Sequence, residues 1–165
     1  MRVGIGFDAH PFAAGRPLRV GGVEIPGAAG LSGHSDGDVL LHAVADAILG
    51  AAGLGSLGEH FPDDSDAWRG ADSALLLDRA AALARDAGFR IGNVDAVVVA
   101  ESPRLAPHAA RIRDRIAGIL GTTAARVSVR GTSSNGLGFP GRGEGMAAVV
   151  VVLLEGDGEP PAERP

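Results

Sequence analysis

Three side chains with the chemistry of metal ligands stand in two segments near the start of the chain. Asp8 and His10 are two residues apart in the stretch 2–10, whose composition indicates a strand, so both side chains are expected on one side of it. His42 follows in a second segment, 34–53. One carboxylate and two imidazoles supply three ligands for a divalent metal such as zinc and leave a fourth position open, which is typical of catalytic sites.

The segment around His42 predicts a buried helix. Within 39–52 the only polar side chains are His42 and Asp46, and a helix that is apolar on its other faces is buried. Asp38, His42 and Asp46 are four residues apart, so they share one helix face. A buried histidine needs a partner. It is either metal-bound or a core histidine held by Asp46 or a backbone carbonyl.

A second polar constellation lies in the glycine-rich loop 131–145. Glycines let backbone N–H groups approach an anion closely, and the hydroxyls of Thr132, Ser133 and Ser134 add donors. Arg142 offers a planar fork suited to phosphate. The alternative is a glycine-rich turn before an edge strand. The loop is not a P-loop, because Gly-Lys-Ser/Thr is missing.

Composition limits the function further. The 165 residues predict one domain with a real core, since 45% are hydrophobic. No cysteine is present, which excludes disulfides and thiolate metal sites. The net charge is −5, and nothing in the sequence indicates a nucleic-acid surface or a membrane span. All basic residues are arginine, which we attribute to a GC-rich bacterial genome. We expect a cytoplasmic bacterial protein.

Strands and helices are expected to alternate. We predict an α/β fold, an α+β sandwich in which helices pack on one face of a mixed β-sheet, with 1–154 as a single domain. Ser35 or Asp36 is expected to cap the buried helix. The other expected elements are a loop at 11–17, a hairpin of 18–20 and 23–25, a loop at 26–33, an irregular segment at 53–66, a helix at 73–88 capped by Asp72-Ser73, a strand at 91–100, a helix at 107–120, a strand at 127–131, a loop at 132–145, a strand at 146–154 and a disordered tail at 155–165.

Five motifs occur in order along the chain: Gly-Phe-Asp-Ala-His-Pro-Phe, His-Ser-Asp-Gly-Asp-Val-Leu-Leu-His, Phe-Pro-Asp, Gly-Asn-Val-Asp and Gly-Arg-Gly-Glu-Gly. Over residues 2–154 the chain closely resembles the 2-C-methyl-D-erythritol 2,4-cyclodiphosphate synthase family. The resemblance implies cyclisation of 4-diphosphocytidyl-2-C-methyl-D-erythritol 2-phosphate, with release of CMP, in the non-mevalonate route to isoprenoid precursors. It also implies a homotrimer with active sites at the subunit interfaces.

The resemblance also assigns roles to residues. Zinc would bind at Asp8, His10 and His42. A second metal, magnesium or manganese, would bridge the substrate diphosphate near Asn135. We assign His34 and Ser133 to the catalytic machinery. Substrate contacts are expected from Asp8, Ala9, His10, His34, Ser35, Ser56, Leu57, Gly58, Phe61, Pro62, Asp63, Asp64, Ser65, Ala100, Glu101, Ser102, Pro103, Arg104, Leu105, Ala106, Thr132, Ser133, Ser134, Asn135, Phe139 and Arg142.

Within this set the resemblance distinguishes three regions. Residues 100–106 would cradle the cytosine and ribose of the neighbouring subunit's substrate. Residues 56–58 and 61–65 would line the methylerythritol pocket. Phe7, Phe139 and Arg142 would lie at the trimer axis, where family members can hold an isoprenoid diphosphate.

Three positions depart from the family pattern. Ser56 stands where an aspartate is common, Asn135 stands where a glutamate is common, and the pocket loop reads Phe-Pro-Asp-Asp-Ser-Asp. Two other functions remain open at this point. One is a metal-dependent phosphohydrolase with Asp46 or Asp38 as general base. The other is a non-catalytic trimer that binds isoprenoid diphosphates.

Overall fold

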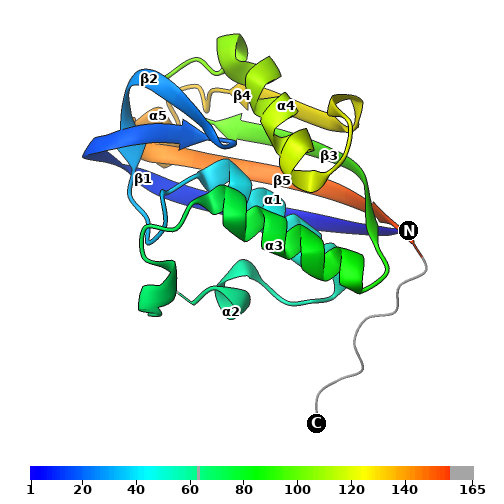
Figure 1. The fold of residues 1–165 in the computed structure, drawn as a ribbon. Helices are drawn as coiled ribbons and strands as arrows, with labels where there is room; N and C mark the ends of the chain where they lie inside the picture. Colours follow the sequence, from blue (N-terminus) through cyan, green and yellow to red (C-terminus); the bar gives the residue numbers. More distant parts are fainter. Residues whose placement is uncertain (63, 157–165) are drawn as a thin grey trace.

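The protein is described by a computed structural model that covers residues 1–62 and 64–156. Five strands form one sheet in the order β2-β1-β5-β3-β4 (Figure 1). Neighbouring strands are antiparallel except β3 and β4, which are parallel. The predicted mixed sheet is therefore confirmed. The strands are β1 (Arg2–Val20), β2 (Val23–Leu31), β3 (Arg90–Val99), β4 (Val127–Thr132) and β5 (Gly145–Glu155).

Helices α1 and α4 pack against the sheet, and Figure 1 shows α3 lying over α1 on the side away from the sheet. The α-helices are α1 (Val39–Ala52), α2 (Leu57–His60), α3 (Ser73–Asp86), α4 (Ala109–Leu120) and α5 (Gly138–Gly141), and 3-10 turns lie at Asp66–Trp68, Ala106–His108 and Ala124–Arg126. Every second residue of β5 from Met146 to Leu154 is fully buried, as expected for a sheet with one face against helices. On the outer face of β1, by contrast, Val3, Ile5 and Phe7 are exposed.

Helix α1 lies unusually close to β1, because two glycines remove the side chains between them. A Cβ atom on Gly4 would lie 2.0 Å from the carbonyl oxygen of Ala47, and one on Gly6 would lie 1.9 Å from that of Ala43. Real side chains do not tolerate such distances, so the backbones meet directly. The Gly4-Ile-Gly6 pattern therefore serves helix–strand packing. It also brings the residues of β1 next to those of α1.

The hairpin is longer than the sequence predicted. Gly21 and Gly22 form its turn with positive φ angles, as expected for a two-residue connection. The expected loops at 11–17 and 26–33 are instead part of β1 and β2, which pair as far as Phe12 and Leu31 with shifts of register on the way. Loops were predicted in these two segments because each of them contains proline. Pro26 is tolerated because β2 is an edge strand, and Pro17 is tolerated because it lies at a shift of register between β1 and β2.

The cap of α1 also differs from the prediction. Asp38, not Ser35 or Asp36, is the N-cap, and its side chain accepts the backbone N–H groups of Leu40 and Leu41. Asp38 also accepts the N–H groups of the hairpin turn at 21–22. It is fully buried, and it fixes the hairpin against the start of α1.

Smaller differences concern element ends. The segment 53–66 contains α2, the loop 132–145 contains α5, α3 ends at Asp86, and the helix expected from 107 begins as a 3-10 turn. Strand β5 continues to Glu155, and the tail expected to be disordered lies from 157 on outside the described residues.

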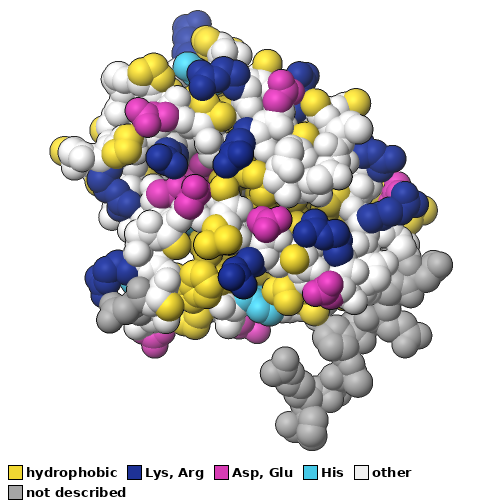
Figure 2. All heavy atoms as spheres, viewed as in Figure 1, with side chains coloured by type: hydrophobic (Ala, Val, Ile, Leu, Met, Phe, Trp, Pro, Cys, Tyr) yellow, Lys and Arg dark blue, Asp and Glu magenta, His cyan; other side chains and the backbone are white. Residues whose placement is uncertain are grey.

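Among the helices of the described residues, none is long and apolar enough to cross a membrane. On the face in Figure 2, arginines alternate with acidic side chains.

Candidate active site

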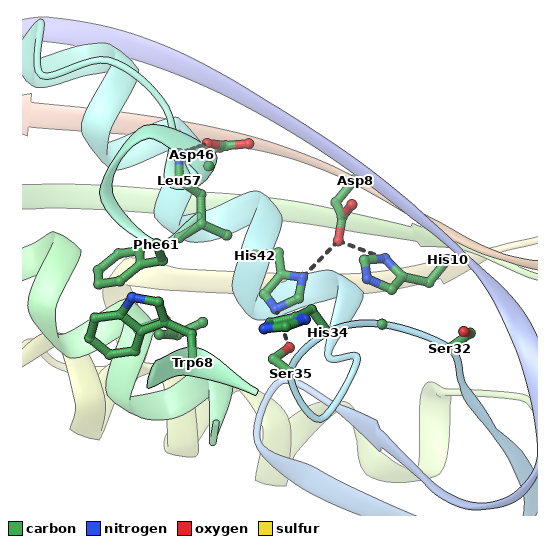
Figure 3. Close-up of a pocket in the computed structure, with 13 residues that line it drawn as sticks. Asp8, His10, Ser32, His34, Ser35, His42, Asp46, Leu57, Phe61 and Trp68 are labelled. Carbon is green, nitrogen blue, oxygen red and sulfur yellow. Dashed lines mark hydrogen bonds and ion pairs between the residues drawn. The ribbon is translucent and has the colours of Figure 1, made fainter. Parts of the chain in front are cut away.

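The three predicted metal ligands meet at one point between β1 and α1. The Oδ2 atom of Asp8 lies 3.0 Å from Nδ1 of His10 and 3.1 Å from Nδ1 of His42 (Figure 3). All three ligand atoms lie within 4.8 Å of one another. Tetrahedral bonds of about 2 Å to a zinc ion would separate neighbouring ligand atoms by about 3.3 Å. The observed spacing therefore fits a divalent cation between the three side chains.

His10 supplies an independent sign of this fit. Its Nδ1 atom is buried, and its contact with Oδ2 of Asp8 at 3.0 Å lacks the geometry of a hydrogen bond. A buried polar atom without a partner is unfavourable and calls for an unseen ligand. A cation bound to this nitrogen would remove the cost.

The electrostatics of the three side chains suit a cation as well. Burial raises the pKa of the Asp8 carboxyl, but its close contacts with His10 and His42 and the charge of these two rings outweigh this effect and lower the pKa to about 2. Asp8 is therefore ionised at neutral pH. Burial lowers the pKa of His42, yet its hydrogen bond to Asp8 and the nearby carboxylates raise the pKa above its ordinary value overall.

His42 is held from its other side by two serines and not by Asp46. Its Nε2 atom lies 2.9 Å from Oγ of Ser73 and 3.0 Å from Oγ of Ser35. Asp46 instead accepts the N–H of Leu57, at the start of α2. The alternative of a core histidine held by Asp46 or a backbone carbonyl is therefore wrong.

Ser73 was missed as a site residue, because the Asp-Ser pair at the start of α3 was interpreted as a cap. Asp72 alone provides that cap and accepts the N–H of Ala74. This frees Ser73 to point inward, where it is fully buried. Ser73 meets His42 because the first turn of α3 packs over α1. The sequence does not reveal this tertiary contact.

A pocket of about 290 Å³ opens beside the triad. Phe61 and Trp68 form one wall, with their rings edge to face at 4.9 Å. His34 also lines the pocket, and its Nε2 is 3.2 Å from the carbonyl oxygen of Ser65. The pocket is lined by the predicted metal or substrate residues Asp8, His10, His34, Ser35, His42, Leu57, Gly58 and Phe61. It is also lined by Asp46, which the hydrolase alternative named, and by the residues not predicted, Ser32, Gly33, Trp68 and Leu76.

Four other described residues were predicted for this pocket and are not among those that line it: Ser56, Pro62, Asp64 and Ser65. Ser56 is the N-cap of α2, and its hydroxyl donates to Glu59. Pro62 and Asp64 are exposed. Asp63 lies outside the described residues.

A second hollow, of about 460 Å³, lies where the parallel strands β3 and β4 end. Ligand sites are common at the carboxyl ends of parallel strands. The predicted residues that line it are Ala100, Glu101, Pro103, Arg104, Leu105, Ala106, Thr132 and Ser133, joined by Val98 and Gly131. Ser102 is exposed and does not line it.

Glu101 shapes the loop on one side of this second hollow. Its carboxylate accepts the N–H and the hydroxyl of Ser134 and the N–H of Gly136. The bond from Gly136 lowers the pKa of Glu101, and the bonds from Ser134 add to this effect against a smaller opposing contribution from burial. Asn135, between them, has a positive φ of 54°.

Within one chain the two hollows share no lining residue. His34 and Ser133, the two predicted catalytic residues, therefore belong to different hollows. Arg142 lines neither and forms a bidentate ion pair with Glu144. Ala9 and Phe139 border a third, shallow depression.

Comparisons with known proteins agree with this geometry. A model of the YgbB family matches residues 1–155. A protein of Pelobacter propionicus named 2-C-methyl-D-erythritol 2,4-cyclodiphosphate synthase is 52% identical over 158 residues, which cover 96% of this chain and 100% of that protein. The chain belongs to the 2-C-methyl-D-erythritol 2,4-cyclodiphosphate synthase family. Enzymes of this name are lyases acting on phosphorus–oxygen bonds, and the predicted family and enzyme class are confirmed over the hydrolase and binding-only alternatives.

Solved structures of the synthase family have the same fold. A structure titled as the synthase in a CDP-bound form is 36% identical, with a TM-score of 0.86, over 93% of this chain and 100% of that one. The bifunctional IspDF of Campylobacter jejuni is 43% identical with a TM-score of 0.91, and the match covers 95% of this chain and 42% of that longer chain. The mixed α/β architecture is thus common to them.

Proposed function

We propose that the protein cyclises 4-diphosphocytidyl-2-C-methyl-D-erythritol 2-phosphate to 2-C-methyl-D-erythritol 2,4-cyclodiphosphate and releases CMP. The observation that carries the proposal is the Asp8, His10 and His42 cluster at the edge of a pocket, in a chain of this family. In the reaction an oxygen of the 2-phosphate attacks the β-phosphorus. The bond from that phosphorus to the bridging oxygen breaks, and CMP leaves with the α-phosphate.

The substrate's own phosphate is the nucleophile and is already an anion, so the protein needs no strong side-chain base. Its task is to bring two ends of a flexible, highly charged molecule together and to neutralise charge as the anhydride breaks. The alternative hydrolase would need a base beside a bound water. Asp38 is unsuited to that task, because it is fully buried and caps α1. Asp46 lines the pocket, but its carboxylate is engaged by the N–H of Leu57.

Asp8, His10 and His42 would hold zinc, which supplies Lewis-acid polarisation of a phosphate oxygen when it is bound. Asn135 would contribute to a second site for magnesium or manganese at the diphosphate. His34 and Ser35 would contact the phosphates from the first pocket. Leu57, Gly58 and Phe61 would enclose the methylerythritol portion beside them.

The second hollow would hold the cytidine portion along 100–106, with Thr132 and Ser133 donating to the diphosphate. One of the related solved structures is a form bound to CDP, which supports a CDP-linked substrate. Since the two hollows are separate in one chain, a complete site requires that the second hollow of one subunit meets the first pocket of another. This need supports a homotrimer with active sites between subunits.

The outer face of the sheet supports the same assembly. Val3, Ile5 and Phe7 are 60–71% exposed along β1, and Val151 on β5 is also exposed. Large apolar side chains gathered on one face are typical of a protein interface. Residues 1–154 would form the single functional domain of each subunit. The isoprenoid diphosphate at the axis and the cytoplasmic location stay predictions.

Phosphorus NMR of the purified protein with the CDP-linked substrate tests the proposed function. We expect signals of a cyclic diphosphate and of CMP, in equal amounts. Linear phosphate fragments would indicate the hydrolase. An unchanged substrate in the presence of zinc and magnesium would contradict catalysis of either kind.

A further inference from the structure

We propose that Ser73 and Asp36 are positioning residues that hold the His42 ring with its proton on Nε2 and its Nδ1 lone pair directed to the metal position. The inference rests on the proposed metal site at Asp8, His10 and His42. It adds a chain of hydrogen bonds behind that site. The chain runs from His42 on α1 to Ser73 at the start of α3, and from there to Asp36 in the loop before α1.

The first step concerns the Ser73 hydroxyl, which has only one hydrogen. Its oxygen lies 2.5 Å from Oδ1 of Asp36 and 2.9 Å from Nε2 of His42. An ionised carboxylate can only accept. The hydroxyl hydrogen therefore goes to Asp36, and the Ser73 oxygen can only accept from His42. Accepting requires that Nε2 carries a proton. Without a metal, the hydrogen bond from Nδ1 to Asp8 needs a second ring proton, and a metal that takes the place of this proton would leave Nδ1 as the ligand atom.

The second step concerns Ser35, whose hydroxyl lies 3.0 Å from the same Nε2. If Ser35 donated to Nε2, the ring proton would move to Nδ1, toward Asp8, and would block the metal position. The buried Ser73 oxygen would then lack the donor at 2.9 Å. The Ser35 hydroxyl has another acceptor in Ser73, at 3.3 Å, and its oxygen accepts the N–H of Gly37. With Nε2 as donor, every hydroxyl hydrogen of the cluster has an acceptor.

The third step concerns the strength of the arrangement. Ser73 is fully buried and Ser35 nearly so, and hydrogen bonds to charged groups are stronger than neutral ones in such surroundings. The other oxygen of Asp36 has no hydrogen-bond partner within the described residues, and the nearest cation, Arg19, is 3.9 Å away. The short bond from Ser73 is therefore the main contact that satisfies this carboxylate.

Such outer partners fix the tautomer and orientation of a metal-binding histidine, and their loss typically weakens metal affinity by about 10-fold to 100-fold. The test is the zinc dissociation constant of the purified full-length protein, measured by competition with a coloured chelator. We expect Ser73→Ala and Asp36→Asn each to raise it by about that factor. The double variant should be no worse than Ser73→Ala alone, because Asp36 acts through Ser73.

Asp72→Ala is the matched control, since it removes the cap of α3 beside Ser73 without touching His42. It should lower the melting temperature and leave the zinc dissociation constant unchanged. Nitrogen-15 NMR of the histidine rings provides a second measurement. In the zinc-bound protein we expect a proton on Nε2 of His42 and the metal on Nδ1.

The outcomes separate this inference from the proposed function. If the unaltered protein binds no zinc, both are wrong. If it binds zinc and Ser73→Ala binds it equally well in a folded protein, the positioning role alone is wrong. An equal loss of affinity in Asp72→Ala would assign the effect to the helix end, and a proton on Nδ1 of His42 in the zinc-bound protein would overturn the tautomer.

Discussion

Asp8 and His42 place Oδ2 and Nδ1 3.1 Å apart, although 34 positions separate them in the sequence. One residue lies on β1 and the other on α1, and the contact depends on the close packing of these two elements. The cluster that could hold a metal therefore exists only in the folded chain. Binding a cation there would add to the free energy of unfolding.

Replacing His42 by alanine should remove tightly bound zinc and abolish cyclisation, because two ligands and an open position hold zinc poorly. Metal content measured after dialysis and product formation followed by phosphorus NMR check this expectation. The assembly state should not change, since His42 lies on the α1 side of β1 and the exposed side chains of β1 lie on the other face. A metal-free His42→Ala protein with full activity would contradict the assignment of Asp8, His10 and His42 as the ligands of a catalytic metal.

Replacing Gly6 by alanine should destabilise the protein by about 1–3 kcal/mol or more, as expected for overpacking in a core. The added methyl group would meet the backbone of Ala43 at 1.9 Å, so α1 must move away from β1. Zinc affinity should fall together with stability, because this movement carries His42 away from Asp8. Thermal unfolding and chelator competition measure the two effects.

Gly50 in α1 provides the control for the Gly6→Ala substitution. It is exposed, and a Cβ there would meet nothing within 4 Å. Gly50→Ala should therefore stabilise the protein by about 0.5–1 kcal/mol through the higher helix propensity of alanine. Equal effects of the two substitutions would show that the close approach of α1 and β1 does not matter.

Replacing Ile5 by aspartate should separate the proposed trimer. The side chain is 71% exposed in one chain, and a charge buried at an apolar interface without a partner is strongly unfavourable. Sedimentation at micromolar concentration should show a smaller species, and activity should fall because the two hollows no longer meet. Leu75→Asp, on the exposed side of α3, should leave the assembly intact. A trimer that survives Ile5→Asp would place the interface elsewhere.

Replacing Asn135 by glutamate should lower the magnesium concentration needed for half-maximal rate. Magnesium prefers charged oxygens, and a charged contact is stronger than a neutral one by about 1–2 kcal/mol. Asn135 adopts a positive φ of 54°, which asparagine tolerates better than most residues. The variant should therefore also be slightly less stable. Equal magnesium requirements in both proteins would show that position 135 does not hold the metal.

Much of the site could be predicted from the sequence because its residues come from regular elements. We could predict that the three ligands converge, because Asp8 and His10 are two residues apart on a strand and His42 lies in an apolar helix. The partner of His42 could not be predicted in this way. Its contact with Ser73 depends on how α3 packs over α1, and serine after aspartate at a helix start has a simpler local explanation.

In the fold as well, some features follow from the local sequence and others depend on the tertiary arrangement. The alternating strands and helices follow from periodicity, and the turn at 21–22 follows from its glycines. The length of β1 and β2 does not, because Pro11, Pro17 and Pro26 indicate loops locally. Strand pairing admits these prolines because Pro26 lies on the edge strand β2, Pro17 lies at a shift of register and Pro11 stands at the last pair of β1 with β5.

The carboxylate of Glu101 bridges two residues of the loop after β4, with bonds to Ser134 and Gly136. The loop is thus held in one shape by the chain itself, before any ligand arrives. A ligand that enters the second hollow would not have to restrict a flexible segment, so little conformational entropy is lost on binding. The negative charge of Glu101 is at the same time balanced by N–H dipoles, which reduces its repulsion of an approaching phosphate.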